Sequence, residues 1–391
     1  MTASARARPA PARLRAMHVI TALNVGGAER MLKKVATGVS PADIHIVSML
    51  EPGITGRRLQ SLGYEVHSLG MARGIPSLAA LQNLRRAIVA KRPDAVVGWM
   101  HHAFFAVTLA RFGIRGAPPL LWNVRHSIDD ISHEPFQTRA VLRLCAGLSA
   151  IPAAIVYNSQ VARRQYAALG FRDDRAHVIP NGFDIEKFRP DSQARGRLAA
   201  AFGIDGDAPV IAMVARLHPM KSQETLITAF RTVLDRGVRA RLLLVGEGMQ
   251  SPPASLRELI ATLPEGSVTL SDHRTDTETW LPGVDIFALS SRWGEAFPNV
   301  LGEAMAAGVP CAATNVGDSA IIIGDTGVVA PPGDASAFAE ALLRLLNLPP
   351  YRRKELGGAA RKRVADLYAL DAVRKQYDDL IASICKADGR A

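Results

Sequence analysis

A buried strand that leads at once into a polar loop and then a helix is the feature that most constrains how this chain of 391 residues can fold. The apolar run Asp285–Leu289 predicts a strand of a parallel sheet. Pro298 then suits the first position of a helix, and Gly308 suits the position after its C-cap. In α/β sheets, ligands bind above the carboxyl ends of such strands. The stretch therefore predicts an α/β fold with a ligand site at this strand end.

Two carboxylates and a helix N-terminus define the chemistry predicted for this loop. Backbone N–H groups at Asn299 and Val300 would lack partners within the helix, and they favour an anion. Glu295 in the loop and Glu303 in the helix can accept hydrogen bonds from hydroxyl groups. These groups predict a ligand that carries both phosphates and hydroxyls. The alternative is a buried helix with two solvated acids.

The run E-A-F-P-N-V-L-G-E-A-M-A-A-G, which starts at Glu295, resembles the signature of the retaining nucleotide-sugar glycosyltransferases of family 4, of the polysaccharide and lipopolysaccharide type. The resemblance implies the GT-B fold. That fold is an α/β architecture of two Rossmann-like domains whose parallel sheets face across a cleft, with a C-terminal helix crossing back to the first domain. It also implies that Glu303 binds the ribose of the donor nucleotide and that Glu295 faces the donor sugar. Phe297 and Pro298 belong to the same motif and are expected at the donor site.

A second pair of charged residues supports this interpretation. Arg216 and Lys221 lie five residues apart, directly after the predicted strand 209–215. They match the pair that contacts the donor diphosphate in the family. Arginine offers a planar fork and lysine a point charge, and both would stabilise the leaving diphosphate as the bond breaks. The alternative is an ordinary pair of surface charges.

The first half of the chain contributes three further candidates. Gly26 and Gly27 follow a predicted strand, and paired glycines let a backbone approach a ligand closely. The resemblance implies that this loop faces the donor phosphates and the acceptor. His126 follows the strand that begins at Leu120, where the family often has a histidine at the mouth of the cleft. It would polarise an acceptor hydroxyl or bond to the donor sugar; the alternative is a structural histidine.

The expected domains follow from the alternation of strands and helices. Residues 1–15 are predicted to be a disordered basic tail, and 16–185 a Rossmann-like acceptor domain. Residues 186–368 are predicted to be the Rossmann-like nucleotide-sugar donor domain. Residues 369–391 are predicted to be the helix that packs back on the first domain. The departure from the family pattern is at 315–321, where Ile321 stands in place of a glutamate.

The excess of positive charge is confined to the first half of the chain. Residues 1–185 hold 23 Lys and Arg against 11 Asp and Glu, whereas the whole chain has a net charge of +11. Such an excess suits an anionic partner such as a lipid headgroup or a pyrophosphate-linked acceptor; the alternative is an arginine-rich composition. The predicted helix from Ser77 to Ala90 is basic, with an apolar stripe at Leu78, Leu81, Leu84 and Ile88. It either faces a membrane or, as is more common, covers a sheet.

The remaining features restrict compartment and cofactors. The three cysteines, Cys145, Cys311 and Cys385, have no disulfide or zinc spacing, which favours a reducing cytosol. We therefore expect a cytoplasmic protein, either free or peripheral on the cytosolic face of the inner membrane. No metal site is evident, and the resemblance implies that none is required. The nucleoside-diphosphate sugar would be a co-substrate, and no other cofactor is expected.

The sequence therefore predicts a hexosyltransferase. It would move a hexose or N-acetylhexosamine from a nucleoside-diphosphate sugar to a glycan or polyprenyl-pyrophosphate-linked acceptor in cell-surface polysaccharide biosynthesis. Two alternatives remain. One is a GT-B-like phosphorylase or epimerase, although the chain shows no pyridoxal lysine site. The other is a non-catalytic basic binding protein, although aromatic-interleaved motifs for nucleic acid are absent.

Overall fold

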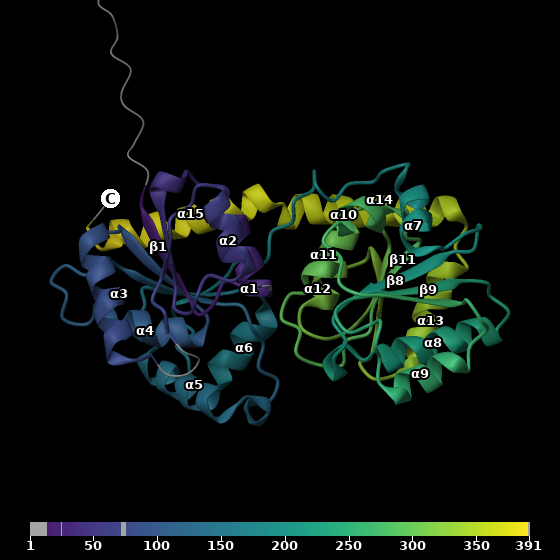
Figure 1. Ribbon diagram of the computed structural model, residues 1–391, viewed down its shortest axis with the longest axis horizontal. Helices are drawn as coiled ribbons and strands as arrows, with labels where there is room; N and C mark the ends of the chain where they lie inside the picture. The colour runs from purple at the N-terminus through teal and green to yellow at the C-terminus, as the bar shows by residue number, and fades with distance from the viewer. Residues whose placement is uncertain (1–13, 25, 72–75, 390–391) are drawn as a thin grey trace, which may run out of the picture. The chain divides into compact units, whose positions relative to one another are not determined.

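The computed structural model describes residues 14–24, 26–71 and 76–389. These residues form two compact α/β units (Figure 1). Residues up to Val124, Glu134–Val156 and Tyr377–Ala391 make the first unit; Arg125–His133 and Tyr157–Gln376 make the second. The predicted basic tail lies outside the described residues as far as residue 13. The boundary predicted at residues 185 and 186 lies inside the second unit, and the domain limits stay a prediction.

The first sheet has seven strands in the order β3-β2-β1-β4-β5-β6-β7. Strand β1 lies between β2 and β4 and is parallel to both, with Met17 opposite His45 and Val96. The order changes direction at β1, as in a doubly wound sheet. The strands are β1 (Ala16–Ile20), β2 (Ile44–Ser48), β3 (Val66–Ser68), β4 (Ala95–Trp99), β5 (Leu120–Val124), β6 (Ala154–Tyr157) and β7 (Ala176–Val178).

The helices that connect these strands are amphipathic. They are α1 (Gly27–Ala36), α2 (Ile54–Ser61), α3 (Leu78–Lys91), α4 (His101–Arg111), α5 (Phe136–Leu148) and α6 (Gln160–Ala168). Ser77 caps α3 as its sequence predicts, since its Oγ accepts a hydrogen bond from Ala80 N at 3.3 Å. The predicted apolar stripe is wrong at Leu78, which is 72% exposed. The buried stripe is Ala80, Leu84 and Ile88, at four-residue spacing, so Leu78 in the first turn lies on another face.

The second sheet has six strands in the order β10-β9-β8-β11-β12-β13. The strands are β8 (Val210–Val214), β9 (Arg241–Val245), β10 (Val268–Ser271), β11 (Ile286–Leu289), β12 (Cys311–Thr314) and β13 (Gly327–Ala330). The helices around it are α7 (Ala194–Phe202), α8 (Gln223–Asp235), α9 (Ala254–Ala261), α10 (Thr277–Trp280), α11 (Asn299–Ala306), α12 (Ser319–Ile323), α13 (Ala335–Leu346) and α14 (Pro350–Tyr368). The predicted strand 285–289 is therefore observed, one residue shorter.

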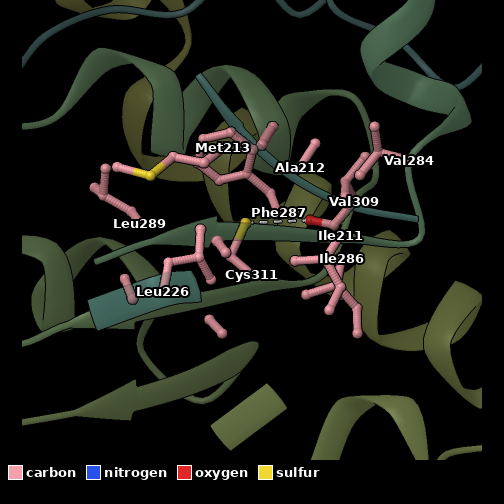
Figure 2. Close-up of a cluster of buried hydrophobic side chains, with 14 of the residues drawn as sticks. Ile211, Ala212, Met213, Leu226, Val284, Ile286, Phe287, Leu289, Val309 and Cys311 are labelled. Carbon is pink, nitrogen blue, oxygen red and sulfur yellow. Dashed lines mark hydrogen bonds between the residues drawn. The ribbon is translucent and has the colours of Figure 1, made fainter. Parts of the chain in front are cut away.

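The core of the second unit is built on its central strands. Figure 2 shows Phe287 and Ile286 of β11 among side chains of β8 and β12. Phe287 is fully buried, as is Cys311, whose Sγ donates to Val309 O at 3.3 Å. Such strands are apolar on both faces because helices cover both sides of a parallel sheet. That is why these segments appear in the sequence as continuous apolar runs.

The helix after β11 follows its predicted limits closely. Pro298, predicted at the first helical position, is instead the N-cap of α11, so the helix begins one residue later at Asn299. Gly308 has a φ of +77°, as the end of the helix requires. Helix α14 packs beside α11 through a close backbone approach (Figure 1). A Cβ at Gly357 would lie 1.9 Å from Gly308 O. Only glycine allows these two segments to approach so closely.

The C-terminal helix α15 (Leu370–Ala387) contributes its last turns to the first unit, as predicted for a helix that crosses back. Tyr377 Oη donates to Asn123 Oδ1 at 3.2 Å, and the Tyr377 ring stacks 6.4 Å from Trp99. Cys385 Sγ donates to Asp94 O at 3.4 Å. All three cysteines are free and buried. No helix within the described ranges is long and apolar enough to span a membrane.

Adjacent glycines in α14 offer a matched test of the close approach. Gly357→Ala should lower the stability of the second unit by roughly 1–3 kcal/mol, because its methyl group would overlap the Gly308 carbonyl. Gly358→Ala meets nothing within 4 Å and should instead add up to about 1 kcal/mol through helix propensity. Urea unfolding of the two variants measures the difference. Equal effects of the two substitutions would contradict the packing described.

The buried His18 predicts acid sensitivity of the first unit. Its Nδ1 accepts a hydrogen bond from Trp99 Nε1 at 3.0 Å, and burial lowers its pKa from 6.5 to about 4. Because the pKa of His18 is lower in the folded than in the unfolded state, the free energy of unfolding has its full value above pH 6.5. It decreases as the pH falls towards 4. The loss should be about 2 kcal/mol at pH 5. Hydrogen exchange of β1 and β4 is measured at pH 7 and at pH 5. The unmodified protein should lose more protection between these two values than the His18→Gln variant, because the glutamine amide does not titrate.

Candidate functional site

The site is built where two neighbouring strands of the second sheet end. Strand β8 pairs with β11, so the loops that follow them start side by side. Ser290 Oγ, directly after β11, donates to Lys221 O at 3.0 Å and Ser222 O at 2.9 Å. Arg292 N donates to Met220 O at 2.7 Å. These bonds join the Arg216–Lys221 loop and the Glu295 loop into one rim at the carboxyl edge of the sheet.

An ion pair connects the two loops through predicted site residues. Lys221 Nζ contacts Glu295 Oε1, and Ser291 Oγ donates to the same oxygen at 2.6 Å. The Glu295 residue is only 7% exposed. Such a pair is stable in a buried position because each charge meets an opposite charge or a hydrogen-bond donor. The structure therefore brings together the lysine predicted for the diphosphate and the glutamate predicted for the sugar.

Arg216 lies on the same loop with its side chain exposed, and Gln223 Nε2 fixes its backbone by donating to Arg216 O at 3.0 Å. His218 is a member of this loop that the sequence did not single out. Its Nδ1 accepts from Met220 N at 3.2 Å and caps the turn Pro219–Lys221. Its pKa is lowered by burial first and then by the neighbouring Arg216 and Lys221. The imidazole therefore stays neutral and keeps an acceptor on the capping nitrogen.

Helix α11 presents its N-terminus directly after the Glu295 loop. Asn299 and Val300 are the first two helical residues, as predicted, and Glu303 lies within the helix at 8% exposure. The Phe297 ring packs in an aromatic cluster, 6.2 Å from the Phe183 ring and 5.3 Å from the Tyr368 ring. The ring therefore anchors the loop in the core. Its predicted contact with the donor stays a prediction, as do the ligand contacts of Pro298, Asn299, Val300 and Glu303.

His126 belongs to a segment that is linked to the Glu295 loop at one residue before the histidine and at one residue after it. Arg125 Nη1 donates to Asn181 Oδ1 at 3.0 Å, and Asn181 Nδ2 donates to Phe297 O at 2.9 Å. Asp129 Oδ2 accepts from Gly294 N at 2.7 Å. The half-buried His126 thus lies between two anchors on this loop. Its catalytic role stays a prediction.

Arg125, Asp129 and Asn181 are not among the candidate site residues predicted from the sequence. Arg125 and Asn181 are separated by 56 residues, Asn181 and Phe297 by 116, and Asp129 and Gly294 by 165. No local pattern predicts such partners. The only available signal was the cluster of polar residues after a strand end.

The segment 315–321, where the chain departs from the family pattern, supports the rim. Gly317 has a φ of +58°, and a Cβ there would lie 2.3 Å from Glu295 O. Asp318 N donates to Ala296 O at 2.9 Å, and its carboxylate accepts from Gln160 N at 2.7 Å. Burial raises the pKa of Asp318. Ile321 is 45% exposed and supplies no carboxylate at the position where the family pattern has a glutamate.

Gly26 and Gly27 lie in the first unit. Gly26 is the N-cap of α1 and Gly27 its first residue, as predicted from the paired glycines. A Cβ at Gly26 would lie 2.3 Å from Glu29 Oε2, so the Glu29 side chain folds over this helix end. Their contact with the donor stays a prediction. Within the described parts of the chain, no group of three or more His, Cys, Asp or Glu side chains is arranged to hold a metal ion.

Comparison with known families gives two matches. Residues 25–187 match Glycosyltransferase Family 4, and residues 208–348 match Glycosyl transferases group 1. The first match includes Gly26, Gly27 and His126. The second includes the whole rim from Arg216 to Glu303. The two matches are consecutive along the chain and together span well over half of it.

Curated relatives and a solved structure agree with these families. The chain is 24% identical over 361 residues to the capsular polysaccharide biosynthesis glycosyltransferase CapM of Staphylococcus aureus, covering 88% of this chain and 90% of CapM. It is 32% identical over 222 residues to a D-inositol 3-phosphate glycosyltransferase of Saccharomonospora viridis, a match over 53% of this chain and only half of that protein.

The fold resembles that of HepE from Anabaena, solved in complex with UDP-glucose. The TM-score is 0.80 at 20% sequence identity, and the match covers 95% of this chain and 100% of HepE. Two parallel sheets, the helix returning to the first unit and the two family matches agree with one another. The chain therefore belongs to the group 1, family 4 glycosyltransferases and is an enzyme with the GT-B fold.

Proposed function

We propose that this glycosyltransferase binds a nucleoside-diphosphate sugar on the rim of its second sheet and transfers a hexose or N-acetylhexosamine with retention of configuration. The observation that supports this most is the joining of Arg216, Lys221, Glu295 and the start of α11 into one rim. Two cations and a helix N-terminus favour two phosphates. Carboxylates beside them favour the hydroxyls of a ribose and a hexose.

The roles of the residues follow from the charge that develops in the reaction. As the anomeric C–O bond breaks, negative charge grows on the diphosphate. Arg216 and Lys221 would stabilise it, together with the N–H groups at the start of α11. Glu303 would accept hydrogen bonds from the ribose, and Gly26 and Gly27 would allow a backbone to approach a phosphate closely. No metal ion is needed in this scheme.

The retaining outcome is proposed to follow a front-face route. The acceptor hydroxyl attacks the anomeric carbon on the side that the diphosphate leaves, and its proton passes to a departing phosphate oxygen. Glu295 already accepts from Ser291 and pairs with Lys221, which suits positioning of the sugar better than attack on it. His126 would orient the acceptor hydroxyl or a sugar hydroxyl from its place between the two anchors on the Glu295 loop.

The proposed acceptor is a glycan or a polyprenyl-pyrophosphate-linked saccharide of a cell-surface polysaccharide. CapM is named for capsular polysaccharide biosynthesis, which supports this class.

The helices α3, α4 and α5 contain no acidic residue, while Phe112 and Phe136 are 82% and 75% exposed. Basic helices beside exposed aromatic rings favour an anionic lipid surface. We therefore propose a cytoplasmic enzyme that acts at the cytosolic face of a membrane.

The donor site can be tested by release of nucleoside diphosphate. Lys221→Ala should lower kcat roughly 10²- to 10³-fold, as does removal of one preorganised donor to a developing charge. Glu303→Ala should raise the KM for the donor roughly 10- to 100-fold, since hydrogen bonds to charged groups contribute about 1.5–3 kcal/mol. A thermal-shift screen of UDP-, GDP- and ADP-sugars would first select the donor.

Matched controls are Lys354→Ala and Glu258→Ala, two exposed residues away from the rim, which should leave both constants unchanged. Unfolding temperatures near that of the unmodified protein would show that the variants are folded. Wild-type rates in both Lys221→Ala and Glu303→Ala would overturn the proposed donor site.

The anchors on the Glu295 loop give a second prediction. Asp129→Ala removes the acceptor for Gly294 N, so the loop should shift and kcat/KM should fall by up to about 10²-fold, the cost of misplacing a reacting group by about 1 Å. The adjacent Asp130→Ala is the control, because Asp130 accepts instead from Ser132 N at 2.7 Å. Equal kinetics of the two variants would contradict a positioning role for Asp129.

A further inference from the structure

A cavity lies in the first unit, apart from the candidate donor site. It has a volume of about 460 Å³ and is lined by residues of helix α3 and strands β1, β2 and β3. This volume is within the range of small-molecule sites. None of its lining residues belongs to the donor site proposed above, whereas helix α3 also forms part of the proposed lipid-facing surface. The cavity therefore calls for an occupant of its own.

The register of the strands explains the floor of this cavity. Met17 is opposite His45, and Val47 is opposite His67, so these four residues point to one face of the sheet. Met17 and His45 are the second residues of β1 and β2, and Val47 and His67 lie further along β2 and β3. Glycosyl donors of this fold are bound above carboxyl ends. The cavity lies instead along one face of the first sheet, against α3.

Small residues on α3 explain why the space is not filled. Asn83, Ala87 and Ala90 lie on one helix face at spacings of four and three residues, and all three line the cavity. Neither alanine has a side chain long enough to reach the floor. The buried stripe of α3 that contains Leu84 and Ile88 lies on a neighbouring face. A single leucine at position 87 would supply the missing volume.

The wall of the cavity carries an excess of positive charge. Lys91 Nζ is bonded to Glu65 Oε1 at 2.8 Å, which neutralises the one carboxylate among the lining residues. Arg86 Nη1 donates only to the neutral Asn83 Oδ1, at 3.2 Å, and no carboxylate among the described residues forms an ion pair with it. His45 Nδ1 is buried without a hydrogen-bond partner within the described chain and is 3.6 Å from Glu65 Oε2.

We propose that this cavity, between α3 and one face of β1–β3, binds a small amphipathic anion. Its acidic group would pair with Arg86 and bond to His45, and its apolar body would lie on Met17, Val47 and Ala87. A buried polar atom without a partner is costly, and a ligand oxygen or hydroxyl would satisfy it. The exposed Arg86 guanidinium beside apolar surface can pair with either a carboxylate or a phosphate ester. The proposed ligand class is therefore a short hydrocarbon that carries one carboxylate or one phosphate group.

The probe for this site is 8-anilinonaphthalene-1-sulfonate, an aromatic anion whose fluorescence rises in apolar sites, with uncharged N-phenyl-1-naphthylamine beside it. The full-length protein should bind the sulfonate saturably, and Ala87→Leu should abolish that signal. Arg86→Gln should raise the Kd at least 10-fold, whereas Arg58→Gln, an equal charge change on α2, should leave it unchanged. Melting curves and nucleoside-diphosphate release should match those of the unmodified protein in all three variants.

Competition distinguishes the source of the anion. Hexyl phosphate or hexanoate should displace the sulfonate, and whichever displaces it at lower concentration identifies a phosphate ester or a carboxylate as the ligand class. Inorganic phosphate alone should not displace it. The proposal is overturned if Ala87→Leu and Arg86→Gln bind the sulfonate as the unmodified protein does. It is equally overturned if the uncharged probe binds as tightly as the anion. Both readouts are independent of whether the donor site acts as proposed.

Discussion

The ion pair between Lys221 and Glu295 is the interaction on which the candidate donor site depends. It connects two loops that belong to neighbouring strands, so a displacement of either loop would separate the charges. A largely buried carboxylate that lost its lysine would face a desolvation cost of several kcal/mol. The backbone bonds around Ser290 and the hydroxyl of Ser291 keep the two loops in register. The order of the strands therefore determines this ion pair, because β8 and β11 are neighbours and the loops that carry Lys221 and Glu295 follow them.

The surroundings of this pair are held by backbone contacts more than by side chains. Gly294 and Gly317 both have positive φ values, of +75° and +58°, and the backbone at Gly317 packs directly on Glu295 O. Asn181 and Asp129 then fix the two ends of the same loop. The isoleucine at position 321 does not disturb this support, since the segment 315–321 contacts the Glu295 loop through its backbone and through Asp318. A missing carboxylate in one position does not remove the support for the rim.

The sequence predicted the regular structure well because a parallel sheet covered on both faces produces apolar runs that stand out from the helices between them. The strands predicted at 209–215 and 285–289 are observed as β8 (Val210–Val214) and β11 (Ile286–Leu289). The position of α11 was predictable for the same reason, from Pro298 and Gly308. The anchors at Asp129 and Asn181 were not predictable, because their partners lie more than 100 residues away. The exposed Leu78 shows a further limit, since an apolar stripe read from spacing does not reveal which helix face the sheet covers.

The pairing of Lys221 with Glu295 also bears on how the proposed donor would bind. A diphosphate that arrives at Lys221 competes with Glu295 for the ammonium, which has three N–H donors and can bond to both. As the phosphates take a share of this charge, the Glu295 carboxylate becomes a stronger acceptor for sugar hydroxyls. Interactions that strengthen as charge develops on the leaving group lower the barrier, whereas those already complete in the free enzyme do not. On this mechanism the resting ion pair keeps both groups oriented before the donor binds. The preorganisation of the site is then already present in the fold, and donor binding needs only to redistribute the lysine's hydrogen bonds.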